Sequence, residues 1–346
     1  MREHPQVIFP LPVTSKYIKF QKHIIMKRLI LSLAILMGAL TSCALDKGKQ
    51  QSSEATANDS IEQETVSTVP QAKKTLKEGK SRIVNATYHS KILGADRTYT
   101  VYLPKSYDVE PDRQYPILYL LHGMLDDNYC WTTRGHLKEV MDTLVAQGKA
   151  TEMVIVTPCA GGEANKDWNG YFNMRGWNYE DFFFKEFVPF IEKEYRILTD
   201  RGHRAAAGLS MGGGAATSFC QRYPDMFCAC YAMSALMDIV PLPGHKAGPN
   251  SKVGIMSAKV GELSCSKFIR QANAATIAKM KTIRWYVDCG DRDFLLKKNQ
   301  EFMAAMDRAG IPYKKQIRKG THSWQYWHSG LFICLPFISE SFAPIP

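Results

Sequence analysis

The 346-residue sequence has no long apolar run, no Cys-x-x-Cys pair and no Cys/His spacing suited to zinc. The longest apolar stretch near the start, residues 29–37, is too short to cross a bilayer, which takes roughly 20 apolar residues. The missing cysteine and histidine patterns exclude a structural zinc site of the common kinds, so we expect no metal. The sequence also has no internal repeat, which excludes a solenoid or propeller.

The excess of positive charge is not evidence for nucleic-acid binding. The formal net charge is +11, but residues 1–42 hold six basic residues against a single acidic one, so five of the eleven charges lie there. The remaining charge is dispersed along the chain rather than clustered, and a nucleic-acid partner therefore loses its main support. The 45% hydrophobic and 22% charged residues are typical of a globular protein.

The N-terminal region has the form of an export signal. Met26-Lys27-Arg28 precedes the apolar run, and a basic start followed by a short apolar segment is typical of secretory signals. The run ends in Leu40-Thr41-Ser42-Cys43, which looks like the lipobox of bacterial lipoproteins. We therefore predict that residues 1–42 are a signal segment with its true start at Met26. Cys43 would carry the lipid and anchor an exported protein to the bacterial membrane.

Residues 43–80 are predicted to be a flexible tether. They are rich in Gln, Ser, Thr, Glu, Lys and Asn and hold almost no large apolar residue, so they cannot bury enough surface to offset the entropy of ordering. Asp46 stands alone beside Lys47 rather than in an acidic cluster, which leaves the side of the membrane open. The oligomeric state is also left open.

From residue 81 onward, apolar strand patterns alternate with helical ones. This alternation predicts one α/β domain, residues 81–346, with a mostly parallel, doubly wound sheet and helices on both faces. The Pro-, Gly- and Lys-rich segment 238–261 is expected to be a long loop or small lid. The predicted strands are 97–103, 116–121, 153–157, 203–207, 227–232 and 283–288, and the predicted helices 136–147, 179–194, 211–222 and 295–309.

The sequence Gly208-Leu209-Ser210-Met211-Gly212 lies between a predicted strand and a predicted helix. A nucleophile elbow needs this strand-to-helix turn, because the turn lifts the serine hydroxyl above the sheet. The start of the helix offers free N–H groups and a positive dipole end to a developing oxyanion. Ser210 is therefore the candidate nucleophile.

An earlier strand ends in Leu121-His122-Gly123-Met124, at the same edge of the sheet. We expect the backbone N–H groups of Met124 and Met211 to form an oxyanion hole beside Ser210. His122 is interpreted as a buried residue that orients this loop rather than as a catalytic base.

An acid follows one late strand, 283–288, and a histidine follows the next strand of the chain. His322, in Gly320-Thr321-His322-Ser323-Trp324, is the candidate base, since a triad histidine must take the serine proton and pass it to the leaving group. Asp288, Asp291 and Asp293 all lie near the end of the preceding strand, and spacing alone does not choose among them.

These motifs together resemble the putative-esterase family of α/β-hydrolases, which includes esterase D, tributyrin esterases, bacterial feruloyl and acetylxylan esterases, and mycolyltransferases. The resemblance covers about residues 87–338 and rests on the Ser210 motif, Leu121-His122-Gly123, Gly290-x-x-Asp293 and Gly320-x-His322-x-Trp324. It implies the α/β-hydrolase fold, Ser210 as nucleophile, His322 as base and Asp293 as the acid, with no cofactor.

The substrate is less clearly encoded. Aromatic residues in the loops expected near the site include Trp131, Trp168 and Tyr171, which could stack on a sugar or an aromatic acyl group, although a structural role is the alternative. Cys130 and Cys159 lie in predicted loops on the same side of the sheet, and the sequence does not decide whether they pair.

The sequence therefore favours an exported serine esterase that removes feruloyl or acetyl groups from plant-polysaccharide fragments, acting on a small-molecule or oligosaccharide ester. An acyltransferase would use the same triad, and an S-formylglutathione hydrolase-like esterase is a further alternative within the family. The alternative of another class is a non-catalytic glycan-binding lipoprotein.

Overall fold

A computed structural model of the chain describes residues 79–161, 170–240 and 248–345. The signal segment, Cys43 and the tether up to residue 78 lie outside these ranges, as does Trp168. In the stretches that are described, no helix combines the length and the apolar character needed to cross a membrane.

The centre of the fold is an eight-stranded sheet with the strand order β1-β2-β4-β3-β7-β8-β9-β10. From β4 to β10 neighbouring strands run parallel, whereas β1 and β2 pair antiparallel and β2 pairs antiparallel with β4. The predicted mostly parallel sheet is confirmed. The strands are β1 (Arg82–Ser90), β2 (Ala95–Leu103), β3 (Ile117–Leu121), β4 (Val154–Pro158), β7 (Arg204–Leu209), β8 (Ala229–Met233), β9 (Arg284–Gly290) and β10 (Lys314–Arg318), with a small separate hairpin of β5 (Asn173–Met174) and β6 (Trp177–Asn178).

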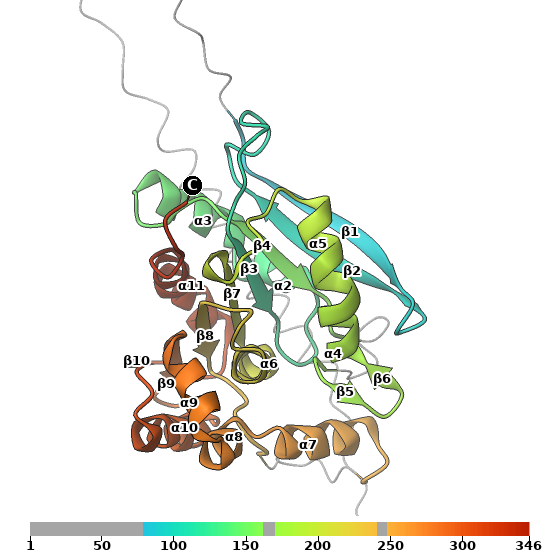
Figure 1. The fold of residues 1–346 in the computed structure, drawn as a ribbon, viewed down its shortest axis with the longest axis vertical. Helices are drawn as coiled ribbons and strands as arrows, with labels where there is room; N and C mark the ends of the chain where they lie inside the picture. Colours follow the sequence, from blue (N-terminus) through green and yellow to red (C-terminus); the bar gives the residue numbers. More distant parts are fainter. Residues whose placement is uncertain (1–78, 162–169, 241–247, 346) are drawn as a thin grey trace, which may run out of the picture. The chain divides into compact units, whose positions relative to one another are not determined.

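Helices cover both faces of this sheet, as Figure 1 shows. One face packs against α3 and α11, and the other against α5, α6, α8 and α10. The helical segments are α2 (Cys130–Thr133), α3 (Leu137–Ala146), α4 (Tyr179–Phe182), the π-helical turn η2 (Phe183–Phe187), α5 (Val188–Glu194), the 3₁₀ turn η3 (Arg201–His203), α6 (Ser210–Arg222), α7 (Lys252–Glu262), α8 (Cys265–Gln271), α9 (Ala274–Lys281), α10 (Leu296–Ala309) and α11 (Trp324–Ser339).

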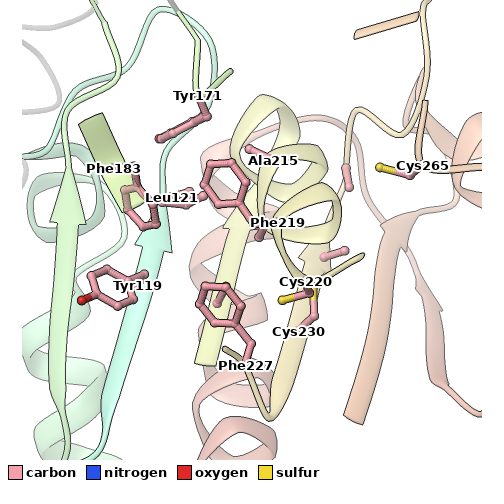
Figure 2. Packing of buried hydrophobic residues seen from close by; sticks show 14 of the residues in the cluster. Tyr119, Leu121, Tyr171, Phe183, Ala215, Phe219, Cys220, Phe227, Cys230 and Cys265 are labelled. Carbon is pink, nitrogen blue, oxygen red and sulfur yellow. The ribbon is translucent and has the colours of Figure 1, made fainter. Parts of the chain in front are cut away.

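Strand β3 illustrates how two cores form from one strand. Its side chains alternate between the faces of the sheet, so Tyr119 and Leu121 enter one core while Leu118 and Leu120 enter the other. Figure 2 shows Tyr119 and Leu121 together with Phe183 of η2 and Phe219 of α6 in the first core. This double burial explains why the strand reads as a continuous apolar run.

The segment 238–261 differs from the expected loop because it contains most of a helix, α7. The side chain of Ser251 accepts a hydrogen bond from the Gly254 N–H at 3.1 Å and so caps the start of this helix. Met256 and Val260, one turn apart, are buried against the core. The predicted helix 179–194 is likewise not uniform, since the π-helical turn η2 separates α4 from α5.

Cys130 and Cys159, which the sequence left open as a pair, are both free and buried, as are the other described cysteines. Their thiols therefore act as small apolar groups inside the protein.

Candidate active site

The turn between β7 and α6 holds Ser210 in a strained conformation. Its φ is 52°, in the left-handed region that non-glycine residues rarely adopt. Glycines flank it because the backbone is crowded there. A β-carbon on Gly208 would lie 2.5 Å from the Gly212 carbonyl carbon, and one on Gly212 would lie 2.4 Å from the His122 oxygen. This strain and crowding are what a nucleophile elbow requires.

His322 lies in the loop between β10 and α11 and joins Ser210 to Asp293. Its Nε2 atom is 2.9 Å from the Ser210 hydroxyl oxygen, and its Nδ1 atom lies 2.9 and 3.1 Å from the two carboxylate oxygens of Asp293. The ring packs edge-on against Trp327, with centroids 4.9 Å apart. The two hydrogen bonds and this packing fix the orientation of the imidazole.

Asp293 follows β9 and is only 5% exposed. Its Oδ1 atom also accepts a hydrogen bond from the Leu295 N–H at 2.8 Å. Burial by itself raises the pKa of this carboxyl, but the hydrogen bond and charge of His322, together with the Leu295 N–H, lower it below its usual value. The carboxylate therefore stays ionised beside the imidazole at neutral pH.

The structure separates the three aspartates that the sequence left open. Asp288 is fully buried away from His322, where Arg318 binds it through two nitrogens at 2.7 and 3.0 Å and the hydroxyls of Tyr231 and Tyr326 donate to it. Asp291 accepts a hydrogen bond from the Gly320 N–H at 2.9 Å. Of the three aspartates, Asp293 is the one that contacts His322.

The loop after β3 lies directly against the serine. A β-carbon on Gly123 would come within 3.6 Å of the Ser210 β-carbon, and Met124 lines the same pocket as Ser210. Met211 is the second residue of α6, where a helix leaves its N–H without a partner inside the helix. The two predicted oxyanion donors therefore belong to segments that meet at Ser210.

His122 is fully buried and holds this loop through both ring nitrogens. Its Nε2 atom accepts from the Ala160 N–H at 2.9 Å, so the proton is on Nδ1, which donates to the Gly123 oxygen at 2.7 Å. Burial lowers the pKa of His122 to about 4, which keeps the ring neutral. A histidine with both nitrogens occupied in this way orients the loop and has no free nitrogen for acid–base chemistry.

A largely apolar pocket opens at Ser210. Its walls come from the loop after β3, the segment after β8, helix α7 and the turn after β9, and apart from Ser210 and Ser257 its lining side chains are apolar. The lining residues are Met124, Ser210, Leu236, Ile239, Val240, Met256, Ser257, Val260, Phe294 and Leu295. The segment expected to be a loop or lid thus forms a wall of the pocket.

Trp131 and Tyr171, proposed as substrate contacts, do not line this pocket. Both are fully buried. Trp131 packs against Trp324, and the Tyr171 hydroxyl donates to the His122 oxygen and accepts from the His122 N–H at 2.8 Å. Burial excludes both from contact with substrate, and their role is to support the loop after β3. Trp168 falls outside the described residues, so its position is not defined.

Apart from Met124, the apolar residues that line the pocket were not identified from the sequence. Phe294 directly follows Asp293, and its ring lies 4.6 Å from that of His322. Its position directly after a candidate triad acid could have identified Phe294 as a residue of the site. Nothing in the sequence singled out Ile239, Met256 or Val260. They are apolar residues in a segment of mixed composition, and such residues do not differ in sequence from those that pack in the core.

Among the described residues, no group of three or more His, Cys, Asp or Glu side chains is placed to hold a metal ion. The chemistry available at Ser210 is nucleophilic attack by the serine oxygen, proton transfer through His322 and stabilisation of negative charge by backbone N–H groups.

The chain resembles known esterases in sequence and in structure. It matches the family described as "Putative esterase" over residues 90–338. A solved structure of a ferulic acid esterase is 53% identical, covers 77% of this chain and 100% of that one, and superposes with a TM-score of 0.74.

Two curated relatives extend the comparison. An endo-1,4-beta-xylanase/feruloyl esterase of Xylanibacter ruminicola is 34% identical over 149 residues, which are 42% of this chain and 20% of that enzyme. The chain thus aligns with about a fifth of that relative's length. An acetyl esterase of Caldicellulosiruptor saccharolyticus is 21% identical over 75% of this chain and 98% of its own length.

The family match covers most of the described residues, and the fold and the elbow around Ser210 agree with it. The chain belongs to the putative-esterase family of the α/β-hydrolase superfamily.

Proposed function

We propose that the protein is a serine esterase that acts through an acyl-enzyme on Ser210 and removes feruloyl or acetyl groups from plant-polysaccharide fragments. The observation that carries the proposal is the continuous hydrogen-bonded line from Ser210 through His322 to Asp293. In this mechanism His322 takes the proton of Ser210 as the serine oxygen attacks the ester carbonyl, and the N–H groups of Met124 and Met211 stabilise the oxyanion. His322 then protonates the departing alcohol.

Deacylation repeats these steps with water as the nucleophile. His322 takes a proton from water, the resulting hydroxide attacks the acyl-enzyme, and Ser210 leaves with the proton returned by His322. Asp293 remains ionised throughout and stabilises the imidazolium that forms in each half of the reaction.

The feruloyl group is the favoured acyl group for two reasons. A ferulic acid esterase is the relative with 53% identity over its whole chain, and the pocket at Ser210 is lined almost entirely by apolar side chains. The sugar that forms the alcohol part of the ester carries hydroxyl groups, and an apolar wall cannot give them hydrogen bonds. The wall therefore suits the acyl part of the ester.

Labelling with a fluorophosphonate tests the nucleophile. We expect covalent modification of the wild-type protein on Ser210, located by peptide mass spectrometry, and none in Ser210→Ala. A folded wild-type protein that is not labelled would instead favour a non-catalytic glycan-binding role.

We also propose that the protein is exported and anchored by a lipid on Cys43, because a basic start, a short apolar run and small residues precede that cysteine. Incorporation of labelled palmitate tests this, with Cys43→Ala as the control. A mature chain that carries no lipid or still begins at Met26 would contradict it.

A further inference from the structure

The turn that follows β3 contains a strained leucine. The Asp126 N–H donates to the Gly123 oxygen at 3.3 Å, which closes a four-residue turn, and Leu125 at its third position has a φ of 65°. Turns with this geometry normally place glycine or asparagine there, because a β-carbon is crowded at positive φ. A branched apolar residue at this position costs stability and needs another reason to be there.

The residues on either side of Leu125 are anchored. Met124 lines the pocket beside Ser210, and Asp126 is buried and forms an ion pair with Arg134. Leu125 is the residue of the turn that faces solvent, with 55% of its surface exposed. The fold therefore holds an apolar side chain in water at a strained backbone position, directly after Met124, which lines the pocket at Ser210.

Two other exposed apolar residues lie at the same edge of the sheet. Phe294, after β9, is 55% exposed and Ile239, after β8, is 44% exposed, and both line the pocket at Ser210. We call Leu125, Ile239 and Phe294 the apolar rim. In the described part of the chain, seven large apolar or aromatic residues are exposed, and these three follow the carboxyl ends of three different strands around Ser210.

We infer that Leu125 is a specificity-determining residue, which packs with the rest of the apolar rim against an aromatic acyl group of the hydroxycinnamoyl class. This inference rests on the proposed esterase function and deepens it. The planar ring of such an acyl group extends from the carbonyl at Ser210 over the rim and removes its apolar surface from water. An acetyl group ends one carbon from the carbonyl and has no ring to pack against Leu125.

The test compares two esters that share one leaving group, 4-nitrophenyl ferulate and 4-nitrophenyl acetate. Leu125→Gly removes the side chain and relieves the strain, whereas Leu125→Ala removes the side chain and keeps the strain. Ile317→Ala is the matched control, because Ile317 is similarly exposed (43%) but lies on β10. Neither of its chain neighbours lines the pocket, whereas Leu125 directly follows Met124, which does.

We expect kcat/KM for the ferulate to fall roughly tenfold in both Leu125 variants, the size of effect that one apolar contact gives in a specificity pocket. Turnover of the acetate should stay within about twofold, the Tm of Leu125→Gly should equal or exceed that of the wild type, and the control should change neither rate.

Three outcomes would overturn the inference. Equal losses with both esters would mean that Leu125 only shapes the turn that carries the oxyanion donor. Unchanged ferulate turnover in the variants would show that Leu125 does not contact the acyl group. A wild-type protein that cleaves the acetate but not the ferulate would show that the acyl group is not aromatic. A wild-type protein that cleaves neither ester would refute the proposed function itself, which separates the two failures.

Discussion

The assignment of the triad acid leads to a prediction in which activity and stability separate. Asp293→Asn and Asp288→Asn remove one negative charge each from neighbouring positions, but from different surroundings. Asp293 contacts His322, whereas Asp288 is fully buried against Arg318 and two tyrosine hydroxyls. One variant should therefore lose catalysis and the other should lose stability.

In Asp293→Asn the imidazole loses the carboxylate that holds its tautomer and stabilises its charged form. Replacing a triad aspartate by asparagine lowers kcat by about 10⁴-fold. In Asp288→Asn the Arg318 guanidinium is left in a largely buried site without a counter-charge, which costs about 3–5 kcal/mol. For a chain of this size that corresponds to a fall in Tm of about 6 °C or more.

The assay measures kcat on 4-nitrophenyl acetate and the Tm by calorimetry or circular dichroism for both variants and the wild type. Kinetics are measured well below the lowest Tm, so that every sample is folded. Near-normal activity in Asp293→Asn together with collapse in folded Asp288→Asn would refute the assignment and make Asp288 the triad acid.

The buried His122, the strained Ser210 and the crowded Gly212 each lead to an expected result that can be measured. Because burial lowers the pKa of His122 to about 4 from 6.5, the unfolded chain binds a proton that the folded one does not, and stability should fall by up to about 3 kcal/mol as the pH drops from 6.5 to 4. Urea unfolding at several pH values should show a smaller loss in His122→Gln, and an identical loss would contradict this. Ser210→Gly should raise the free energy of unfolding by about 1 kcal/mol relative to Ser210→Ala, since glycine accepts the φ of 52° without strain; equal stabilities would show that the elbow is not strained. Gly212→Ala should lower the Tm and the activity together, because its β-carbon would lie 2.4 Å from the His122 oxygen; a variant that keeps both would show that the two segments are less closely packed.

The parts of the fold and site that sequence predicts are those marked by local chemistry. Ser210 stands between two glycines at a strand-to-helix junction, and the buried parallel strands are continuous apolar runs. Both signals come from short stretches of chain and do not depend on distant contacts. They were sufficient to place Ser210 and His322 at the same edge of the sheet.

The parts that sequence does not predict depend on burial by distant segments. Trp131 and Tyr171 were expected near substrate because both were predicted to lie in loops. Trp131 lies instead in α2, and both rings are fully buried by other elements. Strand β1 has no apolar run because it is an edge strand with much of its surface exposed. Helix α7 lies in a segment rich in Pro, Gly and Lys, and what defines its inner face is the core on which Met256 and Val260 pack.

The choice among three aspartates was likewise a matter of tertiary structure. Asp288, Asp291 and Asp293 are close in sequence, but Arg318 binds the first and the Gly320 N–H binds the second. The spacing of the three aspartates along the sequence does not show which group in the folded protein binds each carboxylate. The family resemblance selected Asp293 through its place after Gly290, and the structure brings that residue to His322.

The roles of Ser210 as nucleophile and of feruloyl as acyl group are tested together by kcat/KM for methyl ferulate and for p-nitrophenyl acetate, with Ser210→Ala as the blank. We expect strong turnover of the ferulate that is lost in the variant, which would establish the nucleophile and an aromatic acyl pocket together. Turnover of the acetate alone would keep the esterase and make acetyl the acyl group. Hydrolysis of neither ester, or equal hydrolysis by Ser210→Ala, would show that the protein is not an esterase that uses Ser210 as its nucleophile.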